Sequence, residues 1–219
     1  MSKDFFVFDV IPIEVDVEKV LGQLGYPREA CLSPRLRENV EVQMAEALQL
    51  IEPKGAYLVL EGAEQKRFEL FSEAEGIVLA LATIGPAVEC KARELVNMEH
   101  GAAGLIVDAI GTVAAEQTAD FVERKICQDC AGWAWKVSRR YSPGYCGWGI
   151  EAQMEIFNLF PDTLGIKLTS SCLMIPEKSL SFACLLSTNG NFGKVKVENC
   201  KNCKKKDCPD RLEPYETQG

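Results

Sequence analysis

The stretch "IKLTSSCLMIPEKSLSFACLLS", residues 166–187, decides the fold class. Its two halves, residues 166–174 and 179–187, are strand-like, and the turn "IPEK" lies between them. Two strands joined by a short turn pair antiparallel, because a parallel pair needs a long crossover. The sequence therefore predicts an α+β fold with a mainly antiparallel sheet flanked by helices, rather than a doubly wound parallel sheet.

Three further strands are expected upstream. Residues 56–60 and 67–71 flank a polar turn, which predicts a hairpin. Residues 76–82, "GIVLALA", form a continuous apolar run and are expected to be a buried strand. Pro86 follows a glycine and suits the first turn of the helix that this strand leads into.

Helical periodicity appears in three other segments. Residues 36–51 repeat apolar positions at helical spacing and end just before Pro53. Residues 104–126 predict the longest helix, whose small residues allow another backbone to pack closely. Residues 151–160 predict a helix that ends at Pro161.

Composition limits the class of protein. The chain has 219 residues, of which 47% are apolar and 26% charged, as in an ordinary globular protein with one sizeable core. It lacks a run of about 18 apolar residues and the features of a signal peptide, so we expect a cytoplasmic protein that does not enter a membrane. Its net charge of −8 argues against nucleic-acid binding, and the lysine-rich patch at 194–206 is too short to reverse this.

Ten cysteines in such a chain are not expected to form a disulfide framework. Five occur singly and are expected to be small buried side chains. These five are Cys31, Cys90, Cys146, Cys172 and Cys184.

The tail "CKNCKKKDCPDR" places Cys200, Cys203 and Cys208 in the pattern C-x-x-C-x-x-x-x-C. Thiolates at this density suit zinc or an iron–sulfur cluster, and the spacing does not distinguish the two. Both centres usually take four ligands, and the pair Cys127 and Cys130 could supply another. A reactive or structural thiol cluster without metal is the alternative.

Familiar catalytic motifs are missing from the sequence. It contains neither a P-loop, nor a phosphate-binding G-x-G-x-x-G, nor a G-x-S-x-G nucleophile elbow. Its single histidine, His100, stands in a polar helix end, where a structural role suffices. The sequence therefore does not predict chemistry that depends on acid–base catalysis by histidine.

The segment "RRYSPGYCGWG", residues 139–149, contains the main candidate site. Ser-Pro-Gly predicts an irregular turn in which backbone can approach a flat ligand closely. An arginine at the start of this turn could bind a carboxylate through a bidentate fork. Composition alone leaves a ligand loop and a plain surface turn evenly matched.

Three blocks of sequence, which follow one another in the order found in a known family, favour a ligand loop over a plain surface turn. Residues 140–145 match the R-x-x-x-G-Y motif of the activation (reactivation) domain of cobalamin-dependent methionine synthase. The segment "LGIKLTSSCLMIPEKSLSFA" resembles that family's L-T-x-S-x-x-M-x-P-x-x-S-x-S block, and "AAEQTADFVERKI" resembles its long helix. The chain looks most like the stand-alone form of this domain. The resemblance covers residues 75–190 well and the first 60 poorly.

The resemblance implies an S-adenosylmethionine-dependent corrinoid methyltransferase, or reactivase, that serves methionine synthase. Such a protein docks on the cobalamin-binding module of a methionine synthase that lacks its own activation domain, or on another corrinoid protein. A reductant such as flavodoxin or ferredoxin converts inactive cob(II)alamin to cob(I)alamin, which S-adenosylmethionine then methylates. The chain would contribute positioning and no catalytic side chain. The alternative is a non-catalytic corrinoid docking or storage module.

Residue roles follow from the same resemblance. Arg140 would bind the methionyl carboxylate, Pro143 and Gly144 would shape the loop that approaches the ligand, and Tyr145 would face the corrin. Glu116 would favour the ammonium and sulfonium charges, or would be a solvated helix residue.

The sequence departs from the family at two positions. Cys184 stands where the family has a ligand-contacting tyrosine, so contact there would be through backbone. A ligand-binding aspartate of the family has no match in residues 1–60. The expected organisation is an activation-domain-like core at 61–192 forming one domain with 1–60, and a Cys/Lys-rich tail at 193–219.

Overall fold

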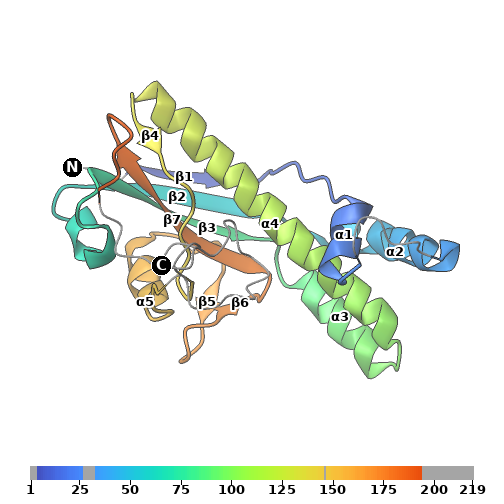
Figure 1. The fold of residues 1–219 in the computed structure, drawn as a ribbon. Helices are drawn as coiled ribbons and strands as arrows, with labels where there is room; N and C mark the ends of the chain where they lie inside the picture. The colour runs from blue at the N-terminus through green and yellow to red at the C-terminus, as the bar shows by residue number, and fades with distance from the viewer. Residues whose placement is uncertain (1–3, 27–32, 146, 194–219) are drawn as a thin grey trace, which may run out of the picture.

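A computed structural model describes residues 4–26, 33–145 and 147–193. Its main sheet has five strands in the order β1-β2-β3-β7-β4, and all neighbours are antiparallel (Figure 1). These strands are β1 (Phe5–Phe8), β2 (Lys54–Glu61), β3 (Gly76–Thr83), β4 (Lys136–Val137) and β7 (Ser179–Ser187). The predicted α+β fold with a mainly antiparallel sheet is confirmed.

The described residues form five α-helices, of which the first three lie together at one end of the molecule (Figure 1): α1 (Val17–Gln23), α2 (Pro34–Ala47), α3 (Ala87–Asn97), α4 (Gly101–Gly132) and α5 (Ala152–Leu159). Helix α4 crosses one face of the sheet, and α5 lies on the other face beside the small hairpin of β5 (Lys167–Leu168) and β6 (Met174–Ile175) (Figure 1). Short 3₁₀ turns occur at Leu48–Leu50, Gln65–Arg67 and Glu69–Phe71. The helices expected near residues 36–51, 104–126 and 151–160 are confirmed. None of the helices in the described part of the chain, α4 included, has the length and apolar character needed to cross a membrane.

Strand β3 is buried along its whole length because both faces of the sheet are covered. Its side chains alternate between two apolar clusters, as the period of a strand requires. Ile77 and Leu79 join the cluster that contains Ile156 of α5, whereas Val78 and Ala80 join the one that contains Val122 of α4. The continuous apolar run at 76–82 therefore reflects burial on two sides, as expected from the sequence.

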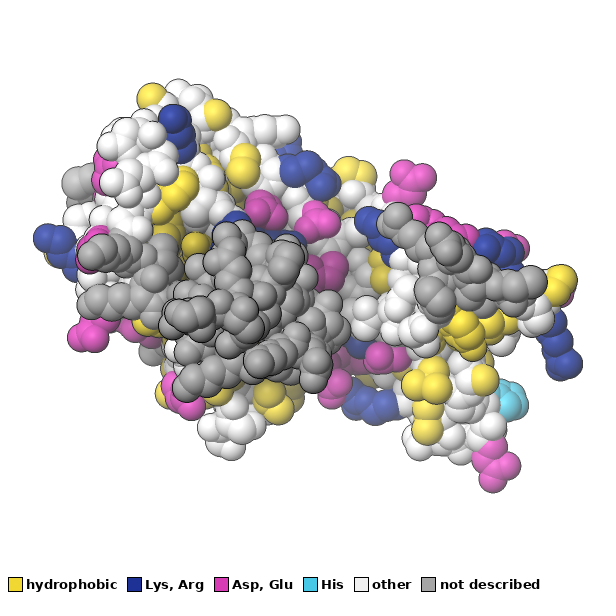
Figure 2. All heavy atoms as spheres, in the orientation of Figure 1, with side chains coloured by type: hydrophobic (Ala, Val, Ile, Leu, Met, Phe, Trp, Pro, Cys, Tyr) yellow, Lys and Arg dark blue, Asp and Glu magenta, His cyan; other side chains and the backbone are white. Residues whose placement is uncertain are grey.

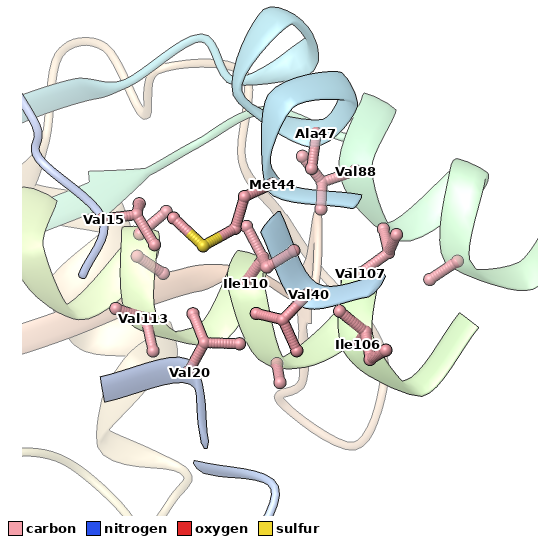
Figure 3. Close-up of a cluster of buried hydrophobic side chains, with 14 of the residues drawn as sticks. Val15, Val20, Val40, Met44, Ala47, Val88, Ile106, Val107, Ile110 and Val113 are labelled. Carbon is pink, nitrogen blue, oxygen red and sulfur yellow. The ribbon is translucent and has the colours of Figure 1, made fainter. Parts of the chain in front are cut away.

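A third apolar cluster fills the helical end of the molecule, where α1, α2 and α3 meet the first half of α4 (Figure 3). Close approach of α3 and α4 depends on Gly104. A methyl group at this position would lie 2.7 Å from the side chain of Val96 and 3.0 Å from the carbonyl oxygen of Ala92. This contact confirms that small residues of the longest helix let another backbone pack against it.

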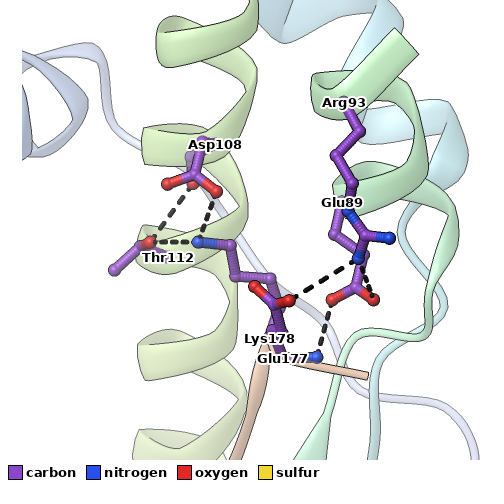
Figure 4. Close-up of polar contacts among 6 residues, drawn as sticks. All are labelled: Glu89, Arg93, Asp108, Thr112, Glu177 and Lys178. Atoms are coloured by element: carbon purple, nitrogen blue, oxygen red, sulfur yellow. Dashed lines mark hydrogen bonds and ion pairs between the residues drawn. The ribbon is translucent and has the colours of Figure 1, made fainter. Parts of the chain in front are cut away.

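Polar contacts tie the start of β7 to α3 and α4 (Figure 4). Lys178 Nζ lies 2.8 Å from Asp108 Oδ1 and donates to Thr112 Oγ1 at 2.9 Å, both on α4. Glu89 of α3 is buried, and its Oε2 accepts a hydrogen bond from the backbone N–H of Glu177 at 2.6 Å. These bonds fix the position of the chain just before β7 crosses beneath α4.

The hairpin expected from residues 56–60 and 67–71 is wrong. Strand β2 pairs with β3, and the segment between them forms two 3₁₀ turns. Phe68 and Phe71 stand three residues apart, so one tight turn directs both rings to the same side, where both contact Trp148 edge-on. The apolar spacing that suggested a strand at 67–71 is the three-residue period of a 3₁₀ turn.

The single strand expected over residues 166–174 is also wrong. The chain reverses within it: the Thr169 N–H donates to the Leu173 carbonyl at 2.8 Å, and Cys172 has a φ of +61°. Hydroxyl side chains favour such turns, and Thr169 Oγ1 accepts from the Leu173 N–H at 3.0 Å. As a result β5 pairs with β6, while β7 pairs with β3 and β4.

The singly placed cysteines divide into two groups. Cys172 and Cys184 are buried as expected. Cys90 was also expected to be buried, but it is exposed because it lies on the solvent-facing side of α3. Cys31 and Cys146 lie outside the described residues.

Candidate functional site

The predicted ligand loop is anchored to the edge of the sheet. After β4, Tyr141 forms a reciprocal pair of backbone hydrogen bonds with Ala183 of β7, each 2.8 Å long. The loop then turns at Gly144, whose φ of +88° favours glycine. The Gly144 N–H donates to the Trp148 carbonyl at 2.7 Å.

This loop presents both apolar and exposed groups. Pro143 and Trp148 are buried, and Trp148 contacts the ring of Phe71 with a centroid separation of 4.9 Å. Tyr145, in contrast, is 54% exposed at the tip. The loop is therefore held from below by aromatic packing and leaves Tyr145 at the surface.

Arg140 lies between the loop and α4, where three carboxylates surround it. Its Nη2 is 2.9 Å from Asp120 Oδ1 and 3.6 Å from Glu116 Oε2, and its Nε is 3.0 Å from Glu123 Oε2. The three acids follow the i, i+4, i+7 spacing of one helix face. Acidic side chains gather over the middle of α4 next to basic ones (Figure 2).

Burial and charge shape this site. The Arg140 side chain is only 25% exposed, and its guanidinium carbon lies 5.4 Å from the centroid of the Phe182 ring. Burial raises the pKa of Glu123 above the usual range for a carboxyl group; Asp120 adds to the shift, and Arg140 opposes it. With three carboxylates and one guanidinium, the cluster has a formal charge of −2 at neutral pH.

A shallow hollow of ≈ 420 Å³ lies beside this cluster. Its lining residues come from the second half of α4: Asp120, Glu123, Arg124, Cys127 and Gln128. The hollow shares Asp120 and Glu123 with the surroundings of Arg140, so the acidic face of α4 is accessible from outside.

Two of the predicted ligand residues, Glu116 and Arg140, are brought into contact. Gly144 and Tyr145 follow on the same loop at the surface. Cys184 lies differently: its side chain is fully buried on the face of β7 under α4, and burial raises the pKa of its thiol well above normal. Its thiol is therefore a packing group in this structure.

Sequence reasoning missed Asp120 and Glu123. The available signal was their helical spacing from Glu116, which places all three on one face. Nothing in the sequence indicated that Arg140 would lie opposite them.

No metal site appears within the described residues, where no group of three or more His, Cys, Asp or Glu side chains could hold an ion. Cys127 is exposed and Cys130 is buried, and burial raises the pKa of the Cys130 thiol to about 12. A neutral thiol is a poor metal ligand. Cys200, Cys203 and Cys208 lie outside the described residues, so metal binding by the tail stays a prediction.

Comparison with known proteins identifies the fold. No protein-family model matches the chain, and no curated protein matches it. Among solved structures, the crystal structure of the MetH reactivation domain bound to AdoHcy superposes with a TM-score of 0.60, covering 88% of this chain and 81% of that one at 14% identity. The chain has the fold of the MetH reactivation domain. In this fold, the acidic face of α4 contacts Arg140 at the start of the loop.

Proposed function

We propose that this chain binds S-adenosylmethionine at the junction of the Arg140 loop and α4 and delivers its methyl group to the cobalt of a corrinoid protein. The proposal depends most on one observation: on a reactivation-domain fold, the predicted loop arginine contacts the predicted helix acid, Glu116. The neighbour with this fold was solved with AdoHcy, the demethylated form of the same ligand.

The charges of the cluster fit this ligand. S-adenosylmethionine has a sulfonium, an ammonium and a carboxylate, and so has a net charge of about +1 at neutral pH. The nearest contacts of Arg140 with the three acids use Nε and Nη2. Its Nη1 edge would bind the ligand's carboxylate, and Glu116 would lie near the two positive groups.

The loop would supply shape rather than charge. Gly144, with Pro143 buried before it, would bring backbone to the ligand through a turn whose φ of +88° favours glycine. Tyr145 would cover the ligand from the side that meets the corrin. Cys184 would support the site from within the core, since its thiol is buried.

The reaction requires no proton transfer by the protein. One electron from an external donor reduces Co(II) of the substrate corrinoid to Co(I). The lone pair of Co(I) attacks the methyl carbon, and the C–S electron pair leaves with sulfur as a neutral thioether. The chain's residues hold the methyl group above cobalt, where orientation lowers the barrier. This agrees with the absence of an acid–base pair among the predicted site residues.

The partner we propose is the cobalamin-binding module of a methionine synthase that lacks its own activation domain. Another corrinoid methyltransferase would present the same chemistry. A flavodoxin or ferredoxin would supply the electron. In this proposal the chain is an enzyme component that reactivates cob(II)alamin.

The direct test mixes the purified chain with a Co(II) corrinoid protein, a one-electron reductant and S-adenosylmethionine, and follows the cobalt spectrum. We expect conversion to the methylated cobalt form, at least tenfold slower with Arg140→Ala. Arg139→Ala is the matched control and should stay close to wild type. Conversion no faster than without the chain would refute the proposal, and an unimpaired Arg140→Ala variant would refute the site.

A second function, a corrinoid docking or storage module without methyl transfer, is favoured by one observation. Arg140 is already held by three carboxylates, which could make it a structural link between the loop and α4. Such a module would bind the corrinoid protein with unchanged affinity whether or not S-adenosylmethionine is present. Affinity that rises with S-adenosylmethionine would exclude it.

Metal binding by the tail is a separate proposal. The spacing of Cys200, Cys203 and Cys208 supports it. Chain purified without oxygen should contain about one zinc ion or one iron–sulfur cluster, and the triple Cys→Ser variant should contain neither. Equal metal content in both would contradict the proposal.

A further inference from the structure

Asp120 and Glu123 both contact Arg140, and the function proposed above gives neither acid a role of its own. Asp120 contacts Nη2 at 2.9 Å, and Glu123 contacts Nε at 3.0 Å. Their side chains are 41% and 28% exposed, so both are within reach of a ligand that reaches Arg140.

These two contacts restrain the orientation of Arg140. The guanidinium group is planar, and its donors point in fixed directions. Asp120 and Glu123 bind different nitrogens from positions nearly one turn apart on α4, while the ring of Phe182 lies 5.4 Å from the guanidinium carbon. Rotation of the guanidinium plane would therefore break at least one ion pair.

The same contacts set the charge of the site. Glu116 alone would form a neutral pair with Arg140, whereas Asp120 and Glu123 bring the cluster to −2. The reactant S-adenosylmethionine has a net charge of about +1, and its product S-adenosylhomocysteine is neutral overall. Charges a few ångströms apart in a partly buried site interact strongly enough to separate two ligands that differ by one unit.

We propose that Asp120 and Glu123 are positioning and specificity residues: they orient Arg140 and make the site prefer the sulfonium reactant to the thioether product. This inference rests on the proposed binding of S-adenosylmethionine. It implies that methyl transfer itself weakens binding, because the positive charge that the two acids attract disappears with the reaction.

The test is titration calorimetry of S-adenosylmethionine and S-adenosylhomocysteine with the full chain. Asp120→Asn and Glu123→Gln should each weaken S-adenosylmethionine binding by about fivefold more than S-adenosylhomocysteine binding, because loss of the Arg140 orientation affects both ligands whereas loss of the negative charge affects the sulfonium alone. The charge-retaining Glu123→Asp should recover most of the preference. Circular dichroism of each variant checks that it is folded.

Asp108→Asn is the matched control. Asp108 is on the same helix and also pairs with a cation, Lys178, but stands twelve residues before Asp120. That separation is about 18 Å along the helix, longer than the Debye length of about 10 Å, so salt largely screens the charge of Asp108 from the site. The Asp108→Asn chain should therefore have the same ratio of affinities for S-adenosylmethionine and S-adenosylhomocysteine as wild type.

The outcomes separate the two levels of the proposal. An affinity ratio that is the same in wild type, Asp120→Asn and Glu123→Gln would overturn this inference while leaving methyl transfer intact. A wild-type chain that binds neither ligand, with or without a corrinoid protein, would refute the proposed function and this inference with it. A ratio that falls in both neutral variants and recovers in Glu123→Asp would support the inference.

Discussion

The two halves of α4 use one helix for different purposes. In residues 101–115, Gly104 lies close against α3, Ile110 packs into the apolar cluster, and most positions are buried. In residues 116–132, one side covers the sheet and the other turns Asp120 and Glu123 towards Arg140. The first half therefore fixes the helix in place, and the second uses that fixed position to hold charged groups in a defined geometry.

The largest effect should come from the first half. Ile110 is fully buried, so Ile110→Ala should lower the free energy of unfolding by about 2–5 kcal/mol, since it removes apolar contacts and leaves a cavity. Leu105→Ala, at a position that is 65% exposed on the same helix, should change it by less than about 0.5 kcal/mol. Urea denaturation measures both. Equal losses would mean that this half of α4 is not the scaffold.

Glu89 tests the polar link between α3, which packs on the first half of α4, and the chain just before β7. Glu89→Ala removes the acceptor of the Glu177 N–H, so we expect a loss of about 2 kcal/mol in the free energy of unfolding. Glu94→Ala, an exposed acid on the same helix, should be nearly neutral. Urea denaturation measures the free energy of unfolding of both variants. A Glu89→Ala chain as stable as Glu94→Ala would show that the Glu89 hydrogen bond adds nothing to stability.

Arg140 should matter less for stability than for function. Arg140→Ala removes three partly exposed ion pairs and leaves three acids facing one another, which should cost about 1 kcal/mol. Thermal unfolding of Arg140→Ala and Arg139→Ala would measure the difference. If Arg140→Ala lowered the free energy of unfolding more than Ile110→Ala does, the Arg140 cluster and not the first half of α4 would be the scaffold.

The smallest effect concerns pH. Because burial raises the pKa of Glu123, the folded chain binds a proton there more tightly than the unfolded chain does. This contribution to stability is present at low pH and is lost as pH rises through the raised pKa. Wild type should therefore lose stability relative to Glu123→Gln as the pH rises from the usual carboxyl pKa, about 4.5, through the raised pKa of Glu123. Urea denaturation at both ends checks the sign, and a gain by wild type would contradict it.

The sequence predicted the scaffold well because periodicity reports burial. The run at 76–82 and the small residues around Gly104 indicated a two-sided strand and a close helix contact, and both were found. Periodicity failed where local bonding decides conformation. Phe68 and Phe71 looked like strand positions but occupy a 3₁₀ turn, and Thr169 reverses a chain that looked extended.

The site was predictable only in part. Motif spacing selected Arg140 and Glu116, which do lie in contact. Asp120 and Glu123 were missed because their importance comes from a loop that returns to α4 across the sheet edge, a contact that no local pattern records. Cys184 was placed by register, but register does not say that the side chain lies under α4.

The most direct test of the central proposal follows the methyl group itself. S-adenosylmethionine labelled in its methyl carbon is incubated with the full chain, a Co(II) corrinoid protein and a one-electron donor, and label on cobalt is counted against S-adenosylhomocysteine formed. The proposed function predicts one labelled methyl on cobalt for each S-adenosylhomocysteine, and a rate that falls at least tenfold in Arg140→Ala but not in Arg139→Ala. Reduction of the corrinoid with no label on cobalt would contradict it.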